Sequence, residues 1–170
     1  MTSASSAAAL SPTNVQRKSD REFVATRTFD APARLVYEAW RNPDLFRKWW
    51  VPEGAGMTLE SCAMDVRTGG NYRLVFRHPG FDQPMAFFGR YTDVVPNERI
   101  AWTNEESGDE GAVTTVTFEE HPGEGQDGKT LVSYSELYPN AAALDEALAG
   151  SAEGLPGQFA QLDALLATGW

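Results

Sequence analysis

Polar and apolar residues alternate along most of the chain between Glu22 and Leu137, with the period of two that β-strands require. Glycine, proline and asparagine divide this region into short segments, as in strands joined by tight turns. The predicted strands are Glu22–Phe29, Met57–Arg67, Asn71–His78, Met85–Val94, Arg99–Thr103, Ala112–Glu120 and Thr130–Leu137. The last six follow one another directly, which predicts an antiparallel meander strongly curved by its glycines.

The pattern changes to helical spacing after the first strand. Apolar residues recur at helical intervals from Leu35 to Trp40, behind Asp30 as the predicted N-cap. Pro43 predicts the end of this helix and the start of a second short helix, which ends in Trp49 and Trp50. Adjacent side chains point in different directions on any regular backbone. We therefore expect one indole to pack inward and the other to lie over an edge or an opening.

A second helical region follows the last strand. From Asn140 onward the chain is rich in Ala, Leu, Glu and Gln, which are good helix formers. Glycines and Pro156 interrupt this region between Gly150 and Gly157, which predicts a kink or two separate helices. An apolar stripe resumes from Phe159 to Leu166, and the concave side of the curved sheet is the obvious surface against which to bury it.

The composition is that of one globular domain. The chain has 170 residues, of which 42% are hydrophobic and 11% aromatic, enough to form a substantial core. We assign residues 21–168 to a single domain. Residues 1–20 are rich in Ser and Ala, lack the pattern of a secretory signal, and are expected to form a disordered leader.

Charge and residue counts exclude several functions. The formal charge of −10 repels nucleic acid and anionic membrane surfaces, so neither is an expected partner. One cysteine, Cys62, and two histidines predict no internal disulfide and no zinc site. We expect no metal and no other cofactor, a cytoplasmic location, and an acidic segment from Glu105 to Glu110 that is a solvated loop. No catalytic triad, phosphate loop or nucleotide-binding motif stands in the required context.

Several local motifs are similar to those of a known family. The relevant segments are RTFDAPARLVYEAWRNPDLFRKWW (27–50), DVRTGGNYR (65–73), GRYTDVVPNERIAWT (89–103), TTVTFEE (114–120) and EGLPGQFAQLDALLA (153–167). They resemble the family of activator of heat-shock-protein-90 ATPase homologues, of the C-terminal-domain type, within the START-related helix-grip (SRPBCC) superfamily. The family's last helix often carries a tryptophan in the region where this chain has Gln158 and Phe159.

This resemblance implies an α+β helix-grip fold. In that fold a curved antiparallel sheet, made by a strand, two short helices and six strands, wraps around a long C-terminal helix. The family name also implies a link to a chaperone and to the stress response. Members differ in their tasks, so the resemblance mainly implies a fold.

A helix laid across a curved sheet leaves an internal cavity unless large side chains fill it, and such cavities are the usual small-molecule sites. Strand phase and helical spacing supply the residues that would line this cavity, although any packed core would use the same residue types. The candidate ligand-binding residues are Tyr72, Leu74, Phe76, Phe87, Tyr91, Trp102, Phe118, Tyr134, Glu136 and Phe159.

Glu136 and His78 are the candidate polar contacts. The strand phase places the Glu136 carboxylate beside Tyr134 on the inner face, where it needs a partner such as an arginine, unless it is exposed at the strand end. His78 precedes a Pro-Gly turn and is expected at a strand end in solvent. Asp65 and Arg67 are expected to form a structural pair near the turn at residues 69–70.

Three functional hypotheses follow. The first is non-catalytic binding of a hydrophobic or aromatic small molecule between the sheet and the C-terminal helix. The second is an interaction domain that associates with a chaperone. The third is a cyclase-like or hydrolase-like enzyme that would use Glu136, Tyr91 or His78. We favour binding over catalysis and assign no catalytic residue. The chain is expected to be a monomer or a homodimer.

Overall fold

The structure is a computed structural model, and the residues that it describes are 13–51, 54, 56–105, 111–121, 128–150 and 154–168. Its strands form one eight-stranded antiparallel sheet in the order β1-β2-β8-β7-β6-β5-β4-β3. Their bounds are β1 Asn14–Arg17, β2 Glu22–Phe29, β3 Thr58–Met64, β4 Asn71–Arg77, β5 Met85–Val95, β6 Arg99–Thr103, β7 Val113–His121 and β8 Lys129–Leu137. The predicted meander is therefore present from β3 to β8, and β2 closes against β8.

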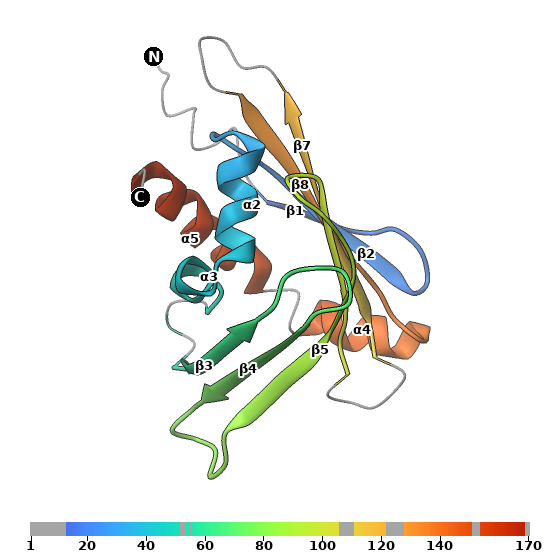
Figure 1. Cartoon of the computed structure of the whole chain (residues 1–170). Coiled ribbons are helices and arrows are strands. Elements are labelled where there is room, and N and C mark those ends of the chain that lie inside the picture. The colour runs from blue at the N-terminus through green and yellow to red at the C-terminus, as the bar shows by residue number, and fades with distance from the viewer. Residues whose placement is uncertain are drawn as a thin grey trace, which may run out of the picture.

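The helices cover the concave side of this sheet. They are α2 Ala33–Arg41, α3 Pro43–Trp49, α4 Ala141–Ala149 and α5 Leu155–Thr168. Figure 1 shows α2, α3 and α5 together on one side of the sheet, while β3, β4 and β5 turn away from the plane of β7 and β8. This is the helix-grip fold that the sequence predicts.

The C-terminal helical region consists of two helices. Asn140 caps α4 by accepting a hydrogen bond from the Ala143 N–H at 2.8 Å. Pro156 lies in the first turn of α5. Backbone N–H groups in the first turn of a helix have no partner within the helix, so the missing N–H of proline costs no hydrogen bond there. The interruption therefore separates α4 from α5, and the long helix has no proline kink.

Two sequence-based expectations about the N-terminal region are wrong. The leader is not disordered throughout, because β1 pairs with β2 along residues 14–17, while residues 1–12 lie outside the described part. Asp30 does not cap α2. The N-cap is Pro32, and the Ala33 N–H instead donates to Glu120 on β7 at 2.8 Å, so a distant strand supplies the acceptor.

A bulge in β3 explains the mixed pattern of this segment. The pairing with β4 shifts between Leu59 and Ser61, so two residues of β3 oppose one of β4 at this point. Leu59 before the bulge and Cys62 after it are the less exposed positions. Because of the extra residue, odd-numbered positions face inward before the bulge and even-numbered positions face inward after it. A strictly alternating pattern cannot predict this change.

The packed half of the core centres on Trp40. This side chain is 2% exposed and contacts the rings of residues from α3, β6, β7, β8 and α5. Trp49 packs against it with ring centroids 4.6 Å apart and donates its indole N–H to the Ala39 carbonyl at 3.0 Å. Rigid aromatic contacts of this kind fasten α2 and α3 onto the sheet.

Among the described residues, no helix has the length and apolar character needed to cross a membrane.

Candidate functional site

A cavity of about 940 Å³ lies between the concave sheet and the ends of α3, α4 and α5. The sheet contributes side chains from β2 to β6 and β8, and the helices cover them from the other side. Its lining is dominated by aromatic and aliphatic side chains. The predicted residues that line it are Tyr72, Leu74, Phe76, Phe87, Tyr91, Trp102, Tyr134 and Glu136.

Two other candidate residues do not line the cavity. Phe118 packs edge-to-face on Tyr37 of α2, with ring centroids 5.7 Å apart. Phe159 is fully buried against Phe29, at 5.9 Å between centroids. Both point inward as predicted, but Phe118 is covered by α2, and Phe159 extends from α5 into the packed part of the core.

Gly89 allows the sheet to bend around the cavity. A Cβ atom at this position would lie 1.9 Å from the Thr103 carbonyl oxygen, so only glycine permits this approach of β5 to the end of β6. The β5–β6 register then shifts between Tyr91 and Asp93, a second irregularity that increases local twist. A glycine in the middle of a strand indicates a bend or a close backbone approach, and the structure has the close approach at this position.

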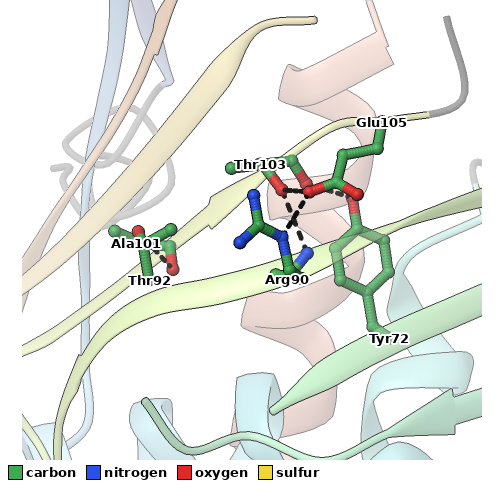
Figure 2. A network of polar contacts seen from close by, with 6 residues as sticks. All are labelled: Tyr72, Arg90, Thr92, Ala101, Thr103 and Glu105. Atoms are coloured by element: carbon green, nitrogen blue, oxygen red, sulfur yellow. Dashed lines mark hydrogen bonds and ion pairs between the residues drawn. The ribbon is translucent and has the colours of Figure 1, made fainter. Parts of the chain in front are cut away.

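A polar network secures this bend (Figure 2). The Thr103 hydroxyl oxygen, Oγ1, accepts a hydrogen bond from the Arg90 backbone N–H at 3.0 Å. The same hydroxyl group donates a hydrogen bond to the Glu105 carboxylate at 2.6 Å. Arg90 also donates to Glu105 through Nε at 2.8 Å. From β4, the Tyr72 hydroxyl donates to the Thr103 carbonyl at 2.9 Å. The Tyr72 ring then packs against Tyr91, with ring centroids 5.6 Å apart, on the cavity wall.

Glu136 is the carboxylate of the cavity lining. Its Oε2 accepts from the Thr114 hydroxyl at 2.7 Å and from the Tyr134 hydroxyl at 2.8 Å, and its Oε1 accepts from the Tyr138 hydroxyl at 2.5 Å. Among the described residues it forms no salt bridge, and it is only partly exposed. The arginine partner considered from the sequence is therefore replaced by hydroxyl groups.

Burial and this carboxylate act together on the neighbouring phenols. Burial, followed by the charge of Glu136 and the hydrogen bond to it, raises the pKa of Tyr134 and of Tyr138 well above the usual value for tyrosine. Burial is also the main cause that raises the pKa of Tyr91. All three hydroxyls thus remain protonated at neutral pH, so Tyr134 and Tyr138 can keep donating to Glu136.

The tandem tryptophans divide as expected. Trp49 is fully buried, whereas Trp50 is partly exposed and lines the cavity. The end of α3 is held by α5, because Gln158 donates to the Trp50 carbonyl and Gln161 donates to the Trp49 carbonyl at 3.0 Å. Gln158 is thus a polar link between α3 and α5.

Helix α4 covers the cavity with small side chains. Ala143 and Ala147 line it, and Glu146 adds an exposed carboxylate beside them. Leu144 is fully buried and anchors the helix. Sequence reasoning missed this contribution because it assigned the cavity to the later helix α5.

Sequence reasoning also missed Thr114, Asn104 and Tyr138. Thr114 shares the inward phase of Val116 and is fully buried, so the alternation of this strand carried the signal. Asn104 and Tyr138 follow directly after the ends of β6 and β8, where alternation no longer applies.

The remaining candidates lie away from the cavity. His78 does not line it, and its Nδ1 accepts from the Gly80 N–H at 2.8 Å in the turn after β4. Arg67 and Asp65 form the expected ion pair at 2.8 Å on the surface. No group of three or more His, Cys, Asp or Glu side chains in the described ranges could hold a metal ion, and most of the acidic segment at 105–110 lies outside them.

Solved structures with the same fold come from several bacteria. A protein from Rhodobacter sphaeroides is 21% identical, with a TM-score of 0.78 over 92% of this chain and 98% of that chain. A protein from Mycobacterium smegmatis is 25% identical, with a TM-score of 0.75 over 94% of this chain and 100% of that chain. A protein from Chromobacterium violaceum is 30% identical, with a TM-score of 0.65 over 85% of this chain and 96% of that chain.

A search of curated proteins finds no match. A family model described as "Activator of Hsp90 ATPase homolog 1-like protein" matches residues 30–167. The match includes both short helices, the strands β3 to β8, α4 and nearly all of α5. The chain therefore belongs to the family of activator of Hsp90 ATPase homolog 1-like proteins.

Proposed function

We propose that this protein binds a hydrophobic or aromatic small molecule in the cavity between the curved sheet and the C-terminal helices, without chemical conversion. The observation that carries the proposal is a cavity of about 940 Å³ whose lining consists mainly of aromatic and aliphatic side chains. Ligand sites in proteins commonly measure roughly 300–1,000 Å³ and combine apolar walls with a few polar groups. Glu136 and its hydroxyl partners supply such polar groups at one position of the wall.

The aromatic wall is suited to binding because its side chains are already held in place. Trp102 packs against Tyr72 and Tyr91 with ring centroids 6.4 Å apart in both pairs, and Tyr72 is also hydrogen-bonded to Thr103. A ligand therefore meets a wall whose rotamers are set before binding, which lowers the entropy lost on association.

The size of the cavity sets the affinity to expect. Drug-sized ligands gain about −0.3 kcal/mol per non-hydrogen atom, so a molecule with about 20 such atoms would reach about −6 kcal/mol. This free energy corresponds to a dissociation constant on the order of tens of micromolar. Titrations should accordingly cover the micromolar range.

The test is a titration with Nile red, an uncharged dye whose fluorescence rises in an apolar environment. We expect saturable binding to the unmodified chain. Ala143→Trp should fill the space beneath α4 and abolish binding, because Ala143 lines the cavity. Ala142→Trp is the matched control, since Ala142 is exposed on the same helix and does not line the cavity. Equal binding by both variants, or no binding by the unmodified chain, would refute the proposal.

The geometry supports binding more than catalysis. Glu136 already accepts from three hydroxyl groups, and the described cavity lining contains no histidine, cysteine or lysine to act with it. Tyr91 lines the cavity, but its raised pKa keeps its hydroxyl group protonated at neutral pH. It therefore cannot accept a proton as a general base. His78, the third residue of the enzymatic hypothesis, lies in a turn outside the cavity.

Chaperone association is the second candidate, because the family model is described by that activity. Phe81 and Phe88 are exposed, Phe81 in the turn before β5 and Phe88 on the face of β5 opposite to the cavity-lining Phe87. Exposed apolar groups of this kind are where a protein partner could dock. Titrating the chain into a heat-shock-protein-90 ATPase assay tests this candidate, and an unchanged hydrolysis rate would remove it.

We further propose a cytoplasmic location with no nucleic-acid partner. The chain has one cysteine and a formal charge of −10, which suit a reducing compartment and oppose binding to phosphate backbones. Burial raises the pKa of the Cys62 thiol, so this thiol is mostly protonated and weakly nucleophilic at neutral pH.

A further inference from the structure

We propose that the cavity selects an amphiphile whose polar end donates hydrogen bonds, with a protonated amine preferred over an alcohol and a carboxylate disfavoured. This inference rests on the proposed binding function and names the class of ligand for that site. It follows from the hydrogen-bond inventory, the charge and the rings around Glu136.

The hydrogen-bond inventory at Glu136 leaves acceptors unused. A carboxylate offers about four acceptor positions. Two hydroxyls occupy Oε2 and one occupies Oε1, so Oε1 retains capacity for a further donor.

The neighbouring polar hydrogens are already engaged. The hydroxyls of Thr114, Tyr134 and Tyr138 all donate to Glu136. The side-chain amide nitrogen of Asn104 donates to the Ala112 carbonyl at 2.9 Å and to Thr114 at 3.0 Å. The protein thus presents acceptors at this position, and the ligand has to bring the donors.

The charge of the lining acts in the same direction. Glu136 and Glu146 both line the cavity, and its described lining contains no lysine, arginine or histidine. A carboxylate ligand would bring like charge close to Glu136 with no cation to compensate. An ammonium group would instead offset the desolvation of a carboxylate that has only neutral partners.

The two tyrosines that donate to this carboxylate belong to a cluster of aromatic rings on the cavity wall. Phe23 lies with its centroid 6.3 Å from the rings of both Tyr134 and Tyr138, and Trp102 lies 6.3 Å from Tyr134. Ring faces attract cations, and this attraction grows when water is excluded. In this site the cationic head of a ligand would pair with the carboxylate, and its apolar body would pack against the aromatic rings.

The test compares decylamine, decanol and decanoate, which share one alkyl chain and differ in the head group. Each is titrated against the full chain with bound Nile red, and displacement gives its relative affinity. We expect decylamine to bind at least about tenfold more tightly than decanoate, as for a hydrogen bond to a charged group, with decanol between them. Equal affinities, or the reverse order, would overturn the inference.

Glu136→Gln keeps the shape of the side chain and removes its charge. We expect this variant to lose about tenfold in decylamine affinity while decanol changes little. Glu98→Gln is the control, because it removes the same charge from an exposed position that does not line the cavity. Equal losses in both variants would assign the preference to the overall field of the protein and overturn the role of Glu136.

These outcomes separate the inference from the function on which it rests. Binding of Nile red and decanol without a preference for decylamine refutes only the ligand class. Failure of every probe to bind the unmodified chain refutes the binding function itself. If Glu136→Gln does not fold, as judged by circular dichroism, the ranking of the three probes on the unmodified chain still decides the question.

Discussion

Both halves of the inner sheet face carry aromatic residues, yet one is solid and the other hollow. Where α2 and α5 cover the sheet, Phe118 packs on Tyr37 and Phe159 packs on Phe29, with ring centroids 5.7 and 5.9 Å apart, and neither Phe118 nor Phe159 lines the cavity. Under α4, Trp102 and Tyr91 border a cavity of about 940 Å³. The difference lies in what covers the sheet: large side chains cover the first half, whereas α4 offers mainly alanines to the second.

This contrast teaches that aromatic content does not decide between core and site. The same residue types stabilise the fold where helices press on them and form a binding wall where small residues face them. Substitutions in the two halves should therefore have different consequences for stability and for binding.

Trp40→Ala should have the largest effect. Trp40 is 2% exposed and lies between the solid half and the cavity wall, in contact with rings from both, so its loss leaves a void that these rings cannot close. We expect the free energy of unfolding to fall by about 5 kcal/mol, the upper end for such truncations. Urea denaturation followed by circular dichroism measures this change, and a loss below that of Trp102→Ala would contradict the division into two halves.

Trp102→Ala should cost less stability and more function. One side of Trp102 borders the cavity, so fewer contacts are lost and the free energy of unfolding should fall by about 3 kcal/mol. Nile red affinity should fall at least about tenfold, because ring contacts of this kind contribute about 1 kcal/mol or more beyond their area. A variant that folds and binds the dye as before would show that this wall takes no part in binding.

Gly89→Ala should distort the bend of the hollow half. The added Cβ would lie 1.9 Å from the Thr103 carbonyl oxygen, a backbone atom that cannot move without disturbing the end of β6. We expect a loss of about 1–3 kcal/mol, as for other overpacked positions, with weaker dye binding. Thermal denaturation and the Nile red titration measure the two effects. An unchanged melting temperature would mean that the sheet accommodates the methyl group.

Alkaline pH should weaken the fold through Tyr134. Its pKa is raised in the folded chain, so above about pH 10 the unfolded chain loses this proton while the folded chain retains it. Stability is then fully present below about pH 10 and decreases as the pH rises further, by up to about 1.4 kcal/mol per pH unit. Denaturation at a series of pH values, compared with Tyr134→Phe, measures this slope. An equal slope in both proteins would contradict the prediction.

Much of the fold was predictable because its signals are local. Alternation located all of the strands from β2 to β8, and Pro43 correctly divided α2 from α3. The structure differed from the prediction where a hydrogen-bond acceptor far away in the sequence replaced a nearby one. Glu120 on β7, and not Asp30, accepts from the first turn of α2, and no pattern near Asp30 could indicate this.

The candidate site was predictable in part for the same reason. Strand phase placed Tyr72, Trp102 and Glu136 on the inner face, where the structure has them. It could not separate them from Phe118, which shares that orientation but is covered by Tyr37 of α2, and helical spacing could not show that Phe159 of α5 packs on Phe29 away from the cavity. The hydroxyl partners of Glu136 come from different strands and from beyond a strand end, so their meeting depends on register.

The amino-acid sequence by itself determined the helices, the strands β2 to β8 and, except in the bulged β3, which side of each of these strands faces inward, because hydrophobic period and turn chemistry act between near neighbours. Only the tertiary structure decided which inward residues pack solidly and which surround an open volume. That outcome depends on the placement of α2, α4 and α5 over the sheet, and on the size of the side chains that each presents to residues far away along the chain.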